Sequence, residues 1–176
     1  LEENTGKVLA ESIKGKATFG DTIFASAYNG TEIEGYAHVG QNKDQLVIDV
    51  GSGANILNIY YSKDVIGGGN NYDEGDDIAD KYQVTVEYKV SPADKGKVTL
   101  EKEVITIYNS DPEPKPAIRG TATISGSEVT PNVGWTLLSW NGTDNSAIET
   151  VDENENKNVL GKIKIEEAVG GSTYTF

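Results

Sequence analysis

The sequence predicts a mainly β (α+β) protein built from two small modules. Apolar and polar residues alternate over several short stretches, whereas a single stretch has a helical pattern. Glycine is frequent, with 20 residues, and a Gly- and Asn-rich stretch separates two β-rich parts of the chain. The expected strands cover residues 45–50, 56–60, 83–90, 98–100, 104–108, 121–124 and 161–165.

The first module, residues 1–64, is expected to combine strands with one short helix. Gly35-Tyr36 forms a turn that leads into a short strand, and residues 55–61 supply a closing strand. A helix is predicted over residues 22–28, because Asp21 can cap its first turn and Asn29-Gly30 can end it. Its apolar face would carry Ile23, Phe24, Ala27 and Tyr28.

The second module, residues 81–176, is expected to be mostly antiparallel β. Its clearest strand is the stretch 83–90, in which the valines and Tyr88 share one face. The other face would carry Gln83, Thr85, Glu87 and Lys89. This alternation predicts an antiparallel strand with one buried and one solvated face.

Three polar stretches are expected to lie outside the strands. Residues 65–80, rich in Gly, Asn and Asp, form the linker between the modules. Alternating prolines within 110–116 predict an extended loop inside the second module, because proline cannot join a central strand. The acidic, Asn-rich run 149–158 is expected at the tip of a hairpin.

Composition excludes several classes of function. The formal net charge of −13 argues against binding to nucleic acids and to anionic membranes, both of which need basic surfaces. The chain has no run of 18 apolar residues, so no membrane insertion is expected. Without cysteine there is no disulfide framework and no thiolate chemistry. The absence of Met, even at position 1, indicates a piece of a longer protein.

The acidic junction is the candidate cation site. Glu74, Asp76, Asp77 and Asp80 could supply carboxylate oxygens to calcium, which binds several oxygen ligands on a flexible loop. However, Tyr72 occupies a position where a ligand is expected, and Asp77 stands where a calcium loop has Gly. The alternative is a solvated linker whose charges repel one another and hold the modules apart. No other cofactor is expected.

Aromatic residues are the candidate ligand contacts. Trp135, Trp140 and Tyr36 can each stack on a sugar ring or anchor an interface, or can fill the core instead. Tyr36 and Trp135 follow a Gly at a turn, which favours core positions. Trp140 precedes Asn141-Gly142, which favours the edge of a sheet, so core and ligand contact stay equally open for it.

No catalytic residues are predicted. His38 is the only histidine, so a three-histidine zinc site is impossible, and no marked nucleophile lies near it in the sequence. Gly67-Gly68-Gly69 lacks the Lys and the following helix of a phosphate-binding loop. We therefore expect that the chain is not an enzyme.

Motifs in both modules resemble bacterial surface repeats. The order Gly6–Ala10, Gly20-Asp21, Gly35-Tyr36 and Asn55–Tyr61 resembles the β-grasp-like repeats of Gram-positive adhesins, including mucin-binding proteins. Two passages of the second module, 133–140 and 172–176, resemble internalin-type B-repeats. The junction 76–82 resembles linkers that read Asp-Gly-Ile-Pro-Asp, with Asp77 and Ala79 at the Gly and Pro positions.

The resemblance implies a location and a function. It implies an extracellular segment, either secreted or in a bacterial cell wall, that adheres non-catalytically to a host glycoprotein or glycan. A structural stalk that projects a distal binding domain is the first alternative, and an accessory module of a secreted carbohydrate-active enzyme is the second. Such repeats have a strand before the turn that is here Glu2–Gly6, so we also expect an open sheet edge that a neighbouring segment or chain could fill.

Overall fold

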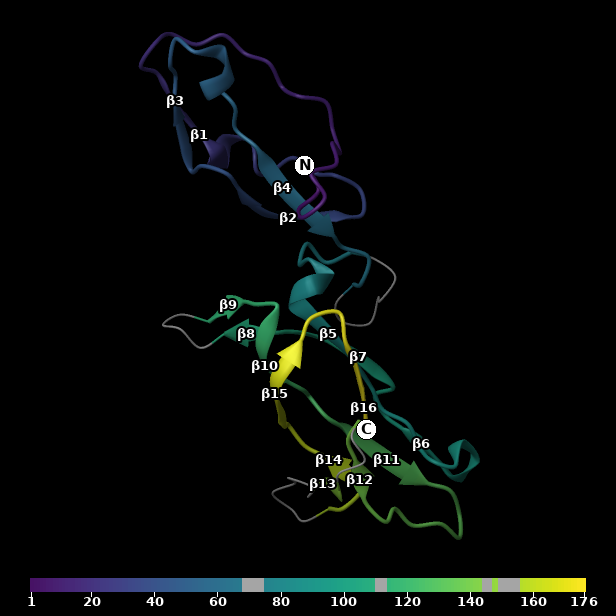
Figure 1. The fold of residues 1–176 in the computed structure, drawn as a ribbon. Coiled ribbons are helices and arrows are strands. Elements are labelled where there is room, and N and C mark those ends of the chain that lie inside the picture. The colour runs from purple at the N-terminus through teal and green to yellow at the C-terminus, as the bar shows by residue number, and fades with distance from the viewer. Residues whose placement is uncertain (68–74, 110–113, 144–146, 149–155) are drawn as a thin grey trace. The chain divides into compact units, whose positions relative to one another are not determined.

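The computed structural model describes residues 1–67, 75–109, 114–143, 147–148 and 156–176 (Figure 1). It confirms the mainly β class: the described residues form short β-strands and single 3-10 turns, and they contain no α-helix. The chain divides into two compact units. Unit 1 comprises Leu1–Val65 with Gly75–Ala79, and unit 2 comprises Ile66–Glu74 with Asp80–Phe176.

Unit 1 is built from two antiparallel ladders of two strands each. One ladder pairs β1 with β3, and the other pairs β2 with β4. The pairing of β2 with β4 has an irregularity between His38 and Gly40. The strands are β1 (Thr22–Phe24), β2 (Tyr36–Gln41), β3 (Gln45–Val47) and β4 (Ile59–Lys63), and 3-10 turns follow at Ala25–Ala27 and Ser52–Ala54.

The helix predicted over residues 22–28 is not present. Thr22–Phe24 is a strand instead, in which Ile23 lies opposite Leu46, and only Ala25–Ala27 forms a 3-10 turn. The β-branched and aromatic residues of this segment favour extended backbone, and pairing with β3 favours the same conformation. Asp21 does not cap a helix: its Oδ2 accepts a hydrogen bond from the Thr18 N–H (2.7 Å). The described part of unit 1 therefore lacks the helix that a β-grasp module places on its sheet.

The first residues of the chain lie along β4. The Tyr61 N–H donates to the Leu1 carbonyl (2.9 Å), and the Glu3 N–H donates to the Tyr61 carbonyl (2.8 Å). Glu2 thereby forms a parallel bridge with Tyr61. Among the described strands, β2 pairs with β4 alone. The N-terminal residues thus occupy the β4 edge of this ladder. An open sheet edge in this unit stays a prediction.

The described part of unit 2 contains four small sheets. Their strand orders are β16-β5-β7, β15-β10-β8-β9, β14-β11-β6 and β12-β13. The strands are β5 (Gln83–Glu87), β6 (Gly96–Val98), β7 (Lys102–Thr106), β8 (Tyr108–Asn109), β9 (Lys115–Pro116), β10 (Arg119–Thr123), β11 (Ser127–Pro131), β12 (Trp140–Asn141), β13 (Ala147–Ile148), β14 (Val159–Leu160), β15 (Lys164–Val169) and β16 (Thr173–Thr175); 3-10 turns cover Asp80–Tyr82 and Ala93–Lys95.

Strand β5 is buried on both faces, whereas the sequence pattern predicted one solvated face. Gln83 and Thr85, expected in solvent, are 2% and 9% exposed. β5 lies between β7, which is antiparallel to it, and β16, which is parallel to it. A central strand with neighbours on both edges is covered on both faces more readily than an edge strand. Alternation within a single strand does not reveal which other segments will cover it.

The core of unit 2 is a cluster around Tyr88. The ring of Tyr88 makes a T-shaped contact with Trp140 (6.4 Å between centroids) and stacks on Phe176 (6.1 Å). The Tyr88 hydroxyl donates to Glu103 Oε1 and accepts from the Gly126 N–H (3.2 Å). The buried members of the cluster are Val84, Val86, Tyr88, Ile107, Ala122, Ile124, Val129, Trp140, Leu160 and Ala168.

Unit 1 buries far fewer apolar side chains. Its buried hydrophobic residues are Ala25, Ala37, Leu46, Tyr61 and Ala79, three of which are alanines. Many of its large hydrophobic side chains lie at the surface, namely Val8, Ile13, Phe19, Phe24, Tyr28, Val47, Val50, Ile56 and Val65. No helix among the described residues is long and apolar enough to cross a membrane.

Candidate functional site

The loop between β11 and β12 displays apolar side chains to solvent. Val133 is fully exposed, Leu138 is 93% exposed and Trp135 is 50% exposed. A tight turn produces this display: the Trp135 N–H donates to the Asn132 carbonyl (3.0 Å), and Gly134 has a φ of +88°. Glycine adopts this left-handed conformation without the steric cost that a Cβ adds. The turn therefore directs Trp135 away from the core.

Hydrogen bonds attach the loop to the 3-10 turn at Ala93–Lys95. The Asn132 N–H donates to the Lys95 carbonyl (2.8 Å), and Asn132 Nδ2 donates to the Asp94 carbonyl (2.8 Å). The Lys95 ammonium lies 4.6 Å from the centroid of the Trp135 ring and 2.5 Å from Asp94 Oδ2. A cation over an indole face is attracted by the ring quadrupole. The indole is thus exposed to solvent but held in place.

Trp135 borders an open depression of about 630 Å³ in unit 2. Its lining from the β11–β12 loop includes the apolar side chains of Trp135 and Leu137. The lining also includes Asn156, Lys157 and Asn158, which come from the segment before β14. An aromatic face beside amide and ammonium groups can bind a ligand that has both apolar and hydroxylated surfaces.

The structure places the two tryptophans differently. Trp140, for which core and ligand contact were both open, lies on β12 of the two-stranded β12–β13 sheet and is 3% exposed in the core. Its Nε1 has no hydrogen-bond partner among the described residues. Trp135, expected in the core, lies at the surface. Both residues sit beside a Gly turn, and their burial depends on which distant strands cover them. That information is not local in the sequence.

Tyr36 does not join Trp135 in one site. It begins β2 of unit 1, where it is half-buried, and its hydroxyl donates to Glu2 Oε1 (3.3 Å). Its ring therefore belongs to the ladder that holds the N-terminal residues.

Two of the candidate calcium ligands, Asp76 and Asp80, accept hydrogen bonds from nearby backbone N–H groups. Asp76 Oδ1 accepts from the Ile78 N–H (3.1 Å), and the Asp77 N–H donates to Asp64 Oδ2 (3.1 Å). Asp80, which belongs to unit 2, accepts from the Ile66 N–H (3.0 Å). Glu74 lies outside the described residues. Over the part of the chain that the structure describes, no three His, Cys, Asp or Glu side chains come together as a metal site would require.

The depression beside Trp135 was missed by sequence reasoning because Asn156–Asn158 lies far along the chain from Trp135. Comparison with known proteins adds no further assignment: no protein-family model, no curated protein and no solved structure matches this chain.

Proposed function

We propose that this chain is a non-catalytic, extracellular segment of a bacterial surface protein, in a cell wall or secreted, and that it binds a host glycan or glycoprotein through the depression beside Trp135. The observation that carries the proposal is a half-exposed indole, held by Lys95 and bordered by amide side chains. The motifs that resemble surface repeats support the same setting, and the absence of cysteine is compatible with it.

The chemistry of the depression suits a sugar. The C–H groups on one face of a pyranose are weakly positive and are attracted to the negative face of an aromatic ring. The hydroxyl groups at the edge of the sugar both donate and accept hydrogen bonds, as the amides of Asn156 and Asn158 also do. A rigid aromatic anchor loses little conformational entropy when it binds.

The test is binding of the full chain to an array of glycans and mucins. We expect saturable binding that Trp135→Ala weakens by about tenfold or more, since a central aromatic anchor is commonly worth 1.4 kcal/mol or more. Tyr108→Ala is the matched control, because Tyr108 is another exposed aromatic residue of unit 2 and lies on β8. It should leave binding unchanged.

Two outcomes would contradict the proposal. Equal losses for Trp135→Ala and Tyr108→Ala would mean that the site lies elsewhere. No binding to any glycan at high micromolar concentration would favour the structural stalk instead. The array is run with calcium and with a chelator, and we expect the same binding in both, because the proposed site contains none of the junction acids.

A further inference from the structure

The first and last described strands of unit 2 lie side by side and run in the same direction. β5 pairs with β16 through Thr85 opposite Thr173, Val86 opposite Tyr174 and Glu87 opposite Thr175. Because the strands are parallel, the beginning of β5 and the end of β16 lie at opposite ends of the pair. A pull on these two points is therefore directed along the strands.

Backbone hydrogen bonds continue this pairing at both ends of the register. At the beginning, the Gly171 N–H donates to the Gln83 carbonyl (2.8 Å), and the Thr85 N–H donates to the Ser172 carbonyl (3.0 Å). At the end, the Phe176 N–H donates to the Glu87 carbonyl (2.9 Å), and the Phe176 carbonyl accepts from the Lys89 N–H (2.9 Å). The joint between the two strands extends from Gly171 to Phe176.

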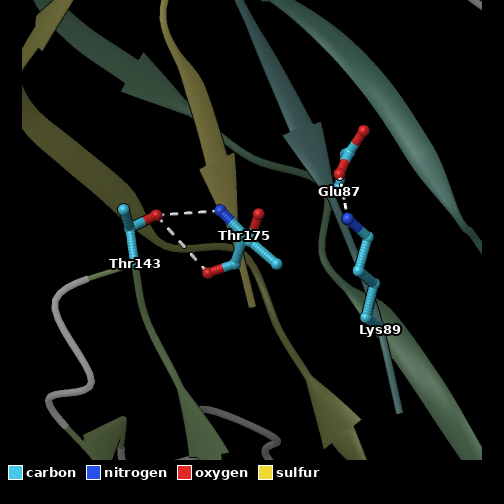
Figure 2. Close-up of polar contacts among 4 residues, drawn as sticks. All are labelled: Glu87, Lys89, Thr143 and Thr175. Atoms are coloured by element: carbon cyan, nitrogen blue, oxygen red, sulfur yellow. Dashed lines mark hydrogen bonds and ion pairs between the residues drawn. The ribbon is translucent and has the colours of Figure 1, made fainter. Parts of the chain in front are cut away.

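A threonine side chain holds the outer edge of β16. The Thr175 N–H donates to Thr143 Oγ1 (2.8 Å), and the Thr143 hydroxyl donates to the Thr175 carbonyl (3.4 Å), as Figure 2 shows. On the neighbouring β5, Glu87 forms an ion pair with Lys89 (Figure 2). The edge of β16 is thus occupied at Thr175 by a group that mimics a further strand.

Side chains fix β16 to the core as well. The ring of Phe176 stacks on Tyr88, which is 2% exposed, and both Tyr174 and Phe176 pack against the buried cluster of unit 2. The Tyr174 hydroxyl accepts a hydrogen bond from the Val169 N–H (3.2 Å). Sliding β16 along β5 would break these contacts together with the backbone hydrogen bonds.

We propose that unit 2 contains a mechanical clamp: the β5–β16 pair resists unfolding when tension is applied through residue 80 and residue 176. Force along parallel strands must break all of their hydrogen bonds together, whereas force across them breaks the bonds one after another. The energy of several bonds then adds to one barrier, and forced unfolding is governed by that barrier. This function is independent of the proposed glycan site.

The test is single-molecule pulling in two directions. The chain has no cysteine, so thiol handles can be placed at will. For force along the strands, Val65→Cys is combined with a cysteine appended after Phe176. For force across them, Val65→Cys is combined with Thr173→Cys, at the beginning of β16. Val65 and Thr173 both have exposed side chains, so we expect both chains to fold.

At one loading rate, we expect the unfolding force of unit 2 to be about twofold or more higher along the strands than across them. The event is recognised by the extended length released, on the order of 300–350 Å in both chains. Equal unfolding forces in the two directions, or a higher unfolding force across the strands, would contradict the proposal that the β5–β16 pair resists tension. Equilibrium unfolding in denaturant should agree between the two chains, which separates mechanical resistance from stability.

A second pair of variants tests the outer edge of β16. Thr143→Val removes both hydrogen bonds to Thr175, whereas Thr143→Ser keeps a hydroxyl. We expect Thr143→Val to lower the force along the strands and Thr143→Ser to keep it near that of the unmodified edge. If both variants unfold at the same force as the parent chain, Thr143 is not part of the clamp.

Discussion

The two units bury their apolar side chains to very different degrees. Unit 2 gathers ten buried hydrophobic residues into one cluster, from β5, β10, β11, β12, β14, β15 and the segments between them. Unit 1 buries mainly alanines with Leu46 and Tyr61, and nine of its large hydrophobic residues are exposed. Since burial of apolar surface is the dominant stabilising term, we expect unit 2 to be more stable than unit 1, although both units contain paired strands.

The largest expected effect comes from Trp140→Ala. Removing this buried ring should cost unit 2 about 3–5 kcal/mol, because the core loses its contact with Tyr88 and retains a cavity. Amide hydrogen exchange, measured residue by residue, should show lost protection in unit 2 and unchanged protection in unit 1. Trp135→Ala, at the half-exposed tryptophan, is the comparison and should cost clearly less than Trp140→Ala, about 1 kcal/mol, because it loses mainly the contact with Lys95.

Tyr88→Phe should destabilise unit 2 by about 1–3 kcal/mol, because Glu103 loses a hydrogen-bond donor and the Gly126 N–H loses its acceptor. Burial, together with the hydrogen bond to Glu103, raises the pKa of Tyr88 well above its ordinary value of 10.0. The unfolded chain therefore ionises this phenol first, and the stability of unit 2 should fall as the pH rises above about 10. The variant should lose this part of the pH dependence.

The free energy of unfolding of unit 2, measured between pH 8 and pH 11.5 in the parent chain and in Tyr88→Phe, tests whether stability falls as the pH rises. A parent chain whose unit 2 keeps constant stability across that range would show that the neutral phenol is not required.

Tyr61→Phe is the matching change in unit 1 and should have a smaller effect. The Tyr61 hydroxyl donates only to the Thr31 carbonyl (2.9 Å), so its loss should cost about 0.5–1.5 kcal/mol. Chemical denaturation followed by the backbone amide signals of unit 1 would measure this cost. A cost larger than that of Tyr88→Phe in unit 2 would reverse the comparison between the units.

Glu167→Asn should have the smallest effect. Glu167 Oε2 lies 3.7 Å from Arg119 Nη1, and both side chains are mostly exposed. An ion pair in such a setting contributes little, and asparagine tolerates the φ of +54° at this position. We expect a change within about 0.5 kcal/mol in thermal unfolding. A larger loss would mean that this exposed ion pair contributes to the stability of unit 2.

Much of the fold could be predicted from local patterns. Alternation in 83–90 placed Val84, Val86, Tyr88 and Val90 on the buried face; the first three are buried and Val90 is partly buried. The prediction of a helix over residues 22–28 was wrong, because the apolar spacing of only seven residues is compatible with a helix and with a strand. The partner of Thr22–Phe24 in the ladder lies about two dozen residues further along the chain.

The candidate site was less predictable than the fold. Trp135 and Trp140 have similar sequence surroundings, yet one is exposed and the other lies against Tyr88. The amides that border the depression come from the segment before β14, and only the folded chain brings them to the β11–β12 loop. The parallel pairing of β5 and β16 is equally non-local, and no turn in the sequence marks it.

The parallel pairing of β5 with β16 also has a consequence for the timing of synthesis. At about 5–20 residues per second, a ribosome needs roughly 4–18 seconds to proceed from Thr85 to Thr173. During this interval β5 can pair with β7, which follows soon after it, but its other edge stays bare. The nascent chain is then exposed to wrong partners, including the β5 of a neighbouring copy. Chaperone demand during translation should therefore peak before the last strand emerges.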